Sequence, residues 1–157
     1  MKNHGTYFKG LIPPPIIFTS LLLLGFTAQW LYPVSLMFPT RSLRLLAGLP
    51  VLTVSGLIAV NAALIMRKNK TDIIFRNPTT KFIRQGSFRF TRNPLYLSLL
   101  LVMGSIAVFA NSAWHVLATI LLFFLLNFHV IAREEKFLES RFGEEYIQYK
   151  KSVRRWI

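Results

Sequence analysis

Apolar residues dominate three long stretches of this chain, and all charged residues lie outside these stretches. Residues 10–40, 45–66 and 93–132 contain no Asp, Glu, Lys or Arg. A helix that crosses a bilayer core needs about 20 predominantly apolar residues. The first two stretches are therefore each long enough for one crossing, and the third is long enough for two.

This pattern predicts helices over residues 12–32, 44–66, 94–110 and 113–132. Asn111 and Ser112 form the polar pair inside the third stretch, so a hairpin turn is expected there. The fold class expected is an all-α polytopic membrane protein with about four transmembrane helices. We expect one membrane domain over residues 1–157, in which two N-terminal helices (1–66) precede a functional half (67–157).

The charge distribution predicts an orientation in the membrane. The formal net charge is +13 although 53% of the residues are apolar. Eight Lys or Arg lie in residues 67–92 and seven in the tail from Arg133, whereas the opposite side carries only Arg41 and Arg44. Cytoplasmic loops are enriched in Lys and Arg. Both termini are thus expected in the cytoplasm, with the N-terminal segment retained as an anchor in the membrane.

Composition also argues against several kinds of site. The chain has no cysteine, and its three histidines are scattered, with no carboxylate at ligand spacing. We therefore expect neither a disulfide nor a metal site. The positive charge lies at membrane boundaries without a nucleic-acid-binding motif, so anionic lipid headgroups are the expected partners and nucleic acid is not.

The stretch FRFTRNPLYL (residues 88–97) marks the start of the third apolar helix. Asn is a favoured N-cap and Pro is favoured at the first helical position, so Asn93 and Pro94 predict a capped helix start. The free N–H groups and the helix dipole create an anion site there, beside Arg92. The alternative is a purely structural start of a membrane helix, flanked by arginines whose charges reach the headgroups.

The tail from Arg133 carries five of the six acidic residues of the chain. An apolar stripe at helical spacing predicts an amphipathic C-terminal helix on the membrane surface, formed by Leu138, Phe142, Tyr146, Tyr149 and Val153. Glu134 and Glu135 lie where the fourth helix should leave the bilayer. Carboxylates at that depth need a partner or a ligand, and a surface ion pair is the simpler alternative.

Taken together, these segments resemble a known enzyme family. The motifs are Arg92-Asn93-Pro94-Leu95-Tyr96, then Glu134-Glu135 after a hydrophobic hairpin, then Phe142-Gly143-Glu144-Glu145-Tyr146 with Tyr149. Their order and spacing are similar to those of the isoprenylcysteine carboxyl methyltransferases, within the wider group that includes phospholipid methyltransferases. The resemblance covers residues 79–157. It implies an integral membrane enzyme that transfers a methyl group from S-adenosylmethionine to a lipid-like or prenylated acceptor, chiefly by positioning the reactants.

The resemblance also implies a set of site residues. The cofactor would be bound by Thr80, Lys81, Phe82, Ile83, Phe88, Asn93, Pro94, Leu95, Tyr96 and Glu134. The catalytic group would be Arg92, Glu134 and Glu135. In this scheme the helix start and Arg92 receive the carboxylate of the cofactor, while Glu134 receives its ammonium group or a ribose hydroxyl. Phe88 and Tyr96 supply walls for the adenine.

Substrate binding is where the sequence departs from the family. The arginine that contacts the substrate in relatives falls on Val130 here, and Arg133 is the nearest candidate to replace it. The acceptor could then be a carboxylate, a lipid amine or another small amphiphile. Two other functions stay open: a membrane reductase of the sterol reductase type, and a small membrane scaffold protein without enzymatic activity.

Overall fold

The structure is a computed structural model, and it describes residues 10–69 and 83–157. All the regular elements in these residues are helical, which confirms the all-α prediction. In chain order they are α2 (Pro14–Leu31), α3 (Arg41–Lys68), the 3₁₀ turn η1 (Gly86–Arg89), α4 (Pro94–Phe109), α5 (Ala113–Phe124), the π-helical segment η2 (Leu125–Ile131), α6 (Ala132–Phe142) and α7 (Glu144–Ser152).

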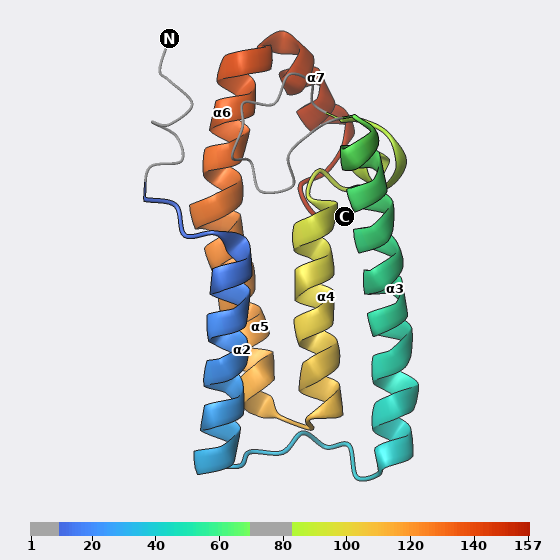
Figure 1. Ribbon diagram of the computed structural model, residues 1–157, viewed down its shortest axis with the longest axis vertical. Helices are drawn as coiled ribbons and strands as arrows, with labels where there is room; N and C mark the ends of the chain where they lie inside the picture. The colour runs from blue at the N-terminus through green and yellow to red at the C-terminus, as the bar shows by residue number, and fades with distance from the viewer. Residues whose placement is uncertain (1–9, 70–82) are drawn as a thin grey trace.

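The long helices run roughly parallel to one axis, with α4 between α3 and α5 (Figure 1). Helix α2 packs mainly on α5 and touches α4 only slightly. The packed core includes Met103, Leu122 and Leu126, none of which has any exposed surface. Many large apolar side chains face outward instead, such as Leu24, Leu57 and Phe128. So extensive an apolar exterior is expected for helices in contact with lipid.

Within residues 10–69 and 83–157, three helical stretches are long and apolar enough to cross a membrane: Pro14–Leu31, Arg41–Lys68 and the continuous run Ala113–Phe142. The fold is therefore that of a polytopic membrane protein. Helix α4 is apolar but has only 16 residues. At a rise of about 1.5 Å per residue it extends roughly 24 Å, less than a hydrocarbon core of about 30 Å. Four complete crossings thus stay a prediction.

The C-terminal helices differ from the prediction in two ways. The helix that starts at Ala113 does not end at residue 132 but continues through η2 and α6 to Phe142. The change from apolar to charged residues near residue 132 marks an expected membrane boundary. The helix continues across it because no residue there breaks a helix. The prediction of a single amphipathic helix along the apolar stripe from Leu138 to Val153 is also wrong. Gly143, with φ of 55°, ends α6, and α7 starts in a new direction.

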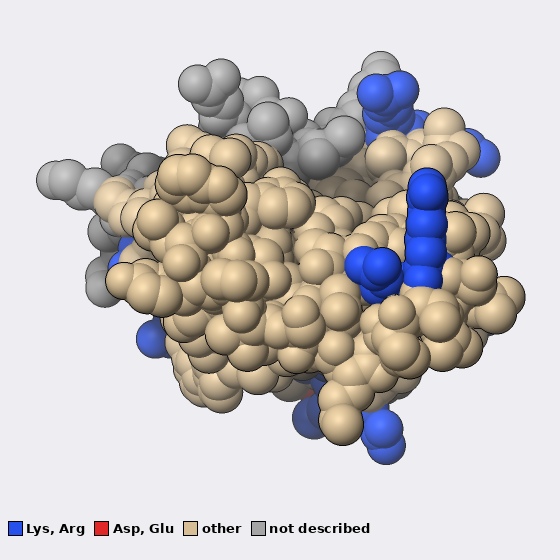
Figure 2. Space-filling model, turned by 90° about the horizontal axis from the view of Figure 1, so that it is seen from below, with Lys and Arg blue, Asp and Glu red and all other residues tan. Residues whose placement is uncertain are grey.

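At the lower end of Figure 1, the loop between α2 and α3 is bound to the α4–α5 turn. Leu36 N donates to Asn111 O at 3.1 Å, and Ala113 N donates to Val34 O at 3.0 Å. Asn111 adopts a φ of 49°, so the predicted hairpin turn is confirmed. Figure 2 shows that this end is covered mostly by uncharged residues, with a few Lys or Arg side chains standing out from it.

Side chains near this turn form a buried hydrogen-bonded group, here called the Ser112 network (Gln29, Ser112 and His115). The Ser112 hydroxyl donates to Gln29 Oε1 at 2.8 Å and lies 3.0 Å from His115 Nδ1. Ser112 and His115 are completely buried. Gly25 lies so close to the His115 ring that a Cβ there would be 3.0 Å from it. This network ties α2 to the start of α5.

Candidate active site

The two polar segments singled out in the sequence meet at the upper end of Figure 1. Because the chain turns back at Gly143, α7 and the C-terminus return toward the first turn of α4 (Figure 1). The backbone N–H of Arg92 donates to Arg154 O at 3.1 Å, which joins the segment before α4 to the C-terminal tail. Helix α6 supplies Glu134 and Glu135 on the other side of this junction.

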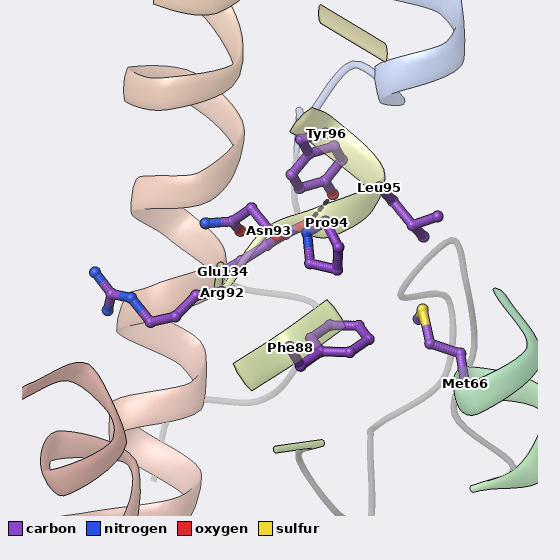
Figure 3. Close-up of a pocket in the computed structure, with 8 residues that line it drawn as sticks. All are labelled: Met66, Phe88, Arg92, Asn93, Pro94, Leu95, Tyr96 and Glu134. Atoms are coloured by element: carbon purple, nitrogen blue, oxygen red, sulfur yellow. Dashed lines mark hydrogen bonds between the residues drawn. The ribbon is translucent and has the colours of Figure 1, made fainter. Parts of the chain in front are cut away.

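A small pocket that is partly open to solvent lies at the first turn of α4. It is lined by Met66, Phe88, Arg92, Asn93, Pro94, Leu95, Tyr96 and Glu134 (Figure 3). All of these except Met66 were selected from the sequence. The folded chain therefore brings residues that are about 40 positions apart, on α4 and α6, to one small cavity.

Glu134 and Tyr96 make a direct contact in the pocket. The Tyr96 hydroxyl donates to Glu134 Oε1 at 2.5 Å, drawn as the dashed line in Figure 3. Both residues are more than nine-tenths buried. A buried carboxyl group needs hydrogen-bond partners, and Tyr96 supplies one to a single oxygen. Glu134 is consequently held in a fixed position against the first turn of α4.

Glu135 points to a different set of partners, here called the Glu135 cluster (Arg92, Glu135, Lys150 and Arg155). Glu135 Oε1 lies 3.1 Å from Arg92 Nη1, and Glu135 Oε2 lies 2.5 Å from Arg155 Nη2 and 3.9 Å from Lys150 Nζ. The side chains of Arg92 and Glu135 are only 9% and 6% exposed. Adjacent glutamates thus have separate surroundings, one facing the pocket and one pairing with cations.

The side chains of Arg92 and Asn93 extend away from Phe88, Leu95 and Met66 (Figure 3). Asn93 does not cap α4 with its side chain, contrary to the prediction. Its Nδ2 donates instead to Arg155 O at 2.9 Å, because the returning C-terminal tail offers a carbonyl there. The N–H groups in the first turn of α4 are therefore not satisfied by the Asn93 side chain, and the pocket lies beside them.

Phe88 reaches the pocket from η1, which is anchored on two sides. Ser87 N donates to Asn61 Oδ1 of α3 at 2.9 Å. On the other side the Tyr149 hydroxyl donates to Phe88 O at 2.6 Å. Burial raises the pKa of Tyr149 to about 12, against the lowering effect of Arg92 and Arg84. Tyr149 therefore remains a neutral phenol and a hydrogen-bond donor at physiological pH.

Gly86 is required for the close approach of η1 to α3. Its φ is 58°, and a Cβ at this position would lie 2.0 Å from Ile65 Cδ1 and 2.6 Å from Asn61 Oδ1. Both the positive φ and the lack of space select glycine. This contact holds η1, which carries Phe88, against α3.

The remaining predicted residues lie elsewhere. Thr80, Lys81 and Phe82 are outside the described residues. Ile83 is buried but does not line the pocket. Arg133 is partly buried on α6, one residue before Glu134. Val130 is completely buried in the helix core, so the position where the resemblance implies a substrate-contacting arginine is used for packing here.

Two residues that contribute to the candidate site were not identified from the sequence. Met66 lines the pocket from α3, but in the sequence it is simply the last apolar residue before Arg67. Arg155 binds Glu135 and Asn127, but it appears in the sequence as one of several cations in a basic tail. The only available signal was that Glu135, as a carboxylate at the membrane boundary, needed a partner.

Comparison with known proteins gives the family. The sequence model of the phospholipid methyltransferases matches residues 43–145, more than half of the chain. The chain belongs to this family. An uncharacterised protein of Haemophilus influenzae is 43% identical over 63 residues, which are 40% of this chain and the whole of that protein. No solved structure matches the chain.

Family membership agrees with the resemblance seen in the motifs. It implies a methyltransferase, and together with the apolar helices it indicates an integral membrane enzyme whose substrates are lipids. The matched range includes the pocket residues on α3, η1, α4 and α6. The scaffold and reductase alternatives have no comparable support.

Proposed function

We propose that this protein is an S-adenosylmethionine-dependent methyltransferase that methylates a lipid-like or prenylated acceptor at the membrane. The observation that carries the proposal is the pocket in which the first turn of α4 lies against Glu134. Membership of the phospholipid methyltransferase family supports the reaction type. The excess of Lys and Arg at this end supports its placement on the cytoplasmic face of a bacterial inner membrane.

The groups around the pocket are suited to the charged part of this cofactor. The first turn of α4 offers N–H groups that the Asn93 side chain does not cap, and such a turn favours a carboxylate. Glu134 offers a second carboxyl oxygen beside the one bonded to Tyr96, as an acceptor for an ammonium group or a hydroxyl. An amino acid moiety presents both kinds of group close together.

The remaining walls are suited to the less polar parts of the reactants. Phe88, Pro94, Leu95 and Met66 give apolar contact surfaces on the side opposite to the Arg92 guanidinium (Figure 3). When bound, the cofactor supplies an electrophilic methyl group. The chain itself would bind and orient the two reactants and exclude water, which accounts for much of the rate in reactions of this kind. Arg92 and Glu135 then serve to position the binding residues.

The first test is equilibrium binding of S-adenosylmethionine to the full-length protein in detergent micelles. We expect saturable binding by the wild type. Glu134→Gln and Tyr96→Phe each remove part of the buried contact, and each should weaken binding about tenfold or more, which is about 1.4 kcal/mol. Glu144→Gln is the matched control, because Glu144 is exposed on α7 and contacts Gln148.

A wild type that does not bind the cofactor would contradict the proposal. So would unchanged binding in both Glu134→Gln and Tyr96→Phe, since the pocket would then not be the binding site. If binding is found, transfer of a labelled methyl group into a membrane lipid extract identifies the acceptor class. A carboxylate, an amine and other amphiphiles give products that chromatography separates.

A further inference from the structure

The C-terminal segment, residues 153–157, lies across the residues that precede α4. The carbonyl of Arg154 accepts from Arg92 N at 3.1 Å. The carbonyl of Arg155 accepts from Thr91 Oγ1 at 3.1 Å and from Asn93 Nδ2 at 2.9 Å. Three consecutive residues just before α4, from Thr91 to Asn93, are thus bonded to two carbonyls of the tail.

The Arg155 side chain is bonded in a second direction, toward α6 and η2. Its Nε and Nη2 donate to the two carboxyl oxygens of Glu135 at 3.2 and 2.5 Å, and its Nη1 donates to Asn127 Oδ1 at 3.0 Å. Such a two-point contact between guanidinium and carboxylate fixes the orientation of both groups. Trp156 Nε1 donates to the same Asn127 oxygen at 3.2 Å. One residue of the tail therefore links the α4 motif to Glu135.

Two consequences follow for the pocket. Arg155 occupies both oxygens of Glu135, while Arg92 approaches only one of them. The orientation of Glu135, and through it that of Arg92, thus depends on Arg155. The Arg155 carbonyl also holds the Asn93 amide away from the first turn of α4. Without that acceptor, Asn93 is free to cap the helix and compete with a ligand for its N–H groups.

We infer that Arg155 is a positioning residue of the active site, and that the C-terminal segment keeps the first turn of α4 open for an anionic group. This inference rests on the proposed function, since the anionic group is the carboxylate of the cofactor. A salt bridge that only stabilised the fold would affect unfolding and leave the affinity of the folded protein unchanged.

Arg155→Ala and Arg155→Lys test the side chain. We expect S-adenosylmethionine to bind about tenfold or more weakly to Arg155→Ala. Arg155→Lys, which keeps the charge but not the two-point contact, should be intermediate. Binding is measured in micelles at a temperature where thermal unfolding shows each variant to be folded. Lys151→Ala, which removes an exposed cation from α7, is the control and should bind like the wild type.

Asn93→Asp and Asn93→Ala test the open helix start. Aspartate cannot donate to the Arg155 carbonyl, and it is a good N-cap that places a negative charge at the N–H groups. It should weaken binding about tenfold or more. Alanine loses the same hydrogen bond without capping the helix, so it should weaken binding clearly less than aspartate does. If Asn93 had only a structural role, Asn93→Asp and Asn93→Ala would weaken binding to a similar extent.

The outcomes separate the two proposals. If the wild type does not bind, the proposed function fails. If the wild type binds but folded Arg155→Lys binds equally well, Arg155 has no positioning role and only the proposed function stands. If Asn93→Asp binds the cofactor as well as Asn93→Ala does, the inference that the C-terminal segment keeps the first turn of α4 open is refuted. Arg155→Lys and the Asn93 pair decide the question even if Arg155→Ala does not fold.

Discussion

The two ends of the helix bundle both bury polar side chains, but they do so in different ways. At the lower end, the Ser112 network joins α2 to α5 through hydrogen bonds without any carboxylate or guanidinium. At the upper end, the Glu135 cluster gathers three cations around one buried carboxylate, next to a cavity. All five described acidic residues lie in α6 and α7, on the side of this cluster.

The difference indicates which end carries the function. A buried hydrogen bond between uncharged groups adds stability and fixes the register of helices at small cost. A buried ion pair has a large desolvation penalty and is a poor way to gain stability. Groups of this second kind are typical of functional sites in membrane proteins. The lower end is accordingly interpreted as structural, and the upper end as the end that carries the proposed site.

The largest effect is expected from removing the carboxylate of the Glu135 cluster. Glu135→Ala leaves Arg92, whose side chain is 9% exposed, without its buried counter-ion. We expect the free energy of unfolding to fall by about 3–5 kcal/mol, the usual cost of breaking a buried pair by removing one partner. Thermal or denaturant unfolding in micelles measures it. A loss below about 1 kcal/mol would show that the cluster is effectively solvated, and would remove the contrast between the two ends.

A smaller effect is expected at the lower end. Ser112→Ala removes the hydroxyl that serves both Gln29 and His115. Leaving buried polar groups without a partner costs about 1–3 kcal/mol in the free energy of unfolding. Cofactor affinity should not change in the folded protein, because the network is at the opposite end of α4 from the pocket. A variant with wild-type stability and weakened binding would contradict this division of roles.

The sequence was informative about the fold wherever hydrophobicity alone decides it. Residues 93–132 predicted a hairpin with a turn at Asn111, and the turn is there because Asn tolerates the positive φ that it requires. The same reasoning failed at residue 132. A hydrophobic boundary shows where lipid should end, and the helix continues because nothing before Gly143 interrupts its backbone hydrogen bonds.

The candidate site was predictable only as far as its motifs are local. The residues from Arg92 to Tyr96 and Glu134 are recognised by order and spacing, and the structure gathers them at one pocket. Arg155 could not be found, because its partners Glu135 and Asn127 are 20 and 28 positions away. The turn at Gly143 brings them together, and a single charged residue in a basic tail carries no sign of that turn.

Close packing at the lower end gives a third prediction. In Gly25→Ala the new Cβ would be 3.0 Å from His115 Cδ2 and Nε2, and the ring is held by Ser112 and cannot move freely. We expect a loss of about 1 kcal/mol in the free energy of unfolding, at the low end of the usual cost of overpacking. Gly56→Ala is the matched control on α3, because no atom lies within 4 Å of its added Cβ. Equal stability of the two variants would show that the Ser112 network is loosely packed.

The smallest effect is expected for an exposed ion pair at the upper end. Arg84 Nη2 donates to Glu145 Oε1 at 3.2 Å, but the side chains are 44% and 66% exposed. Such pairs contribute about 0–1 kcal/mol, because water solvates both charges. Glu145→Gln should therefore lower the free energy of unfolding by less than 1 kcal/mol. A comparison of the loss in Glu145→Gln with the loss in Glu135→Ala shows whether the burial of a carboxylate or the number of charges determines the stability of the upper end. Similar losses in both variants would mean that net charge at this end, rather than the buried cluster, determines stability.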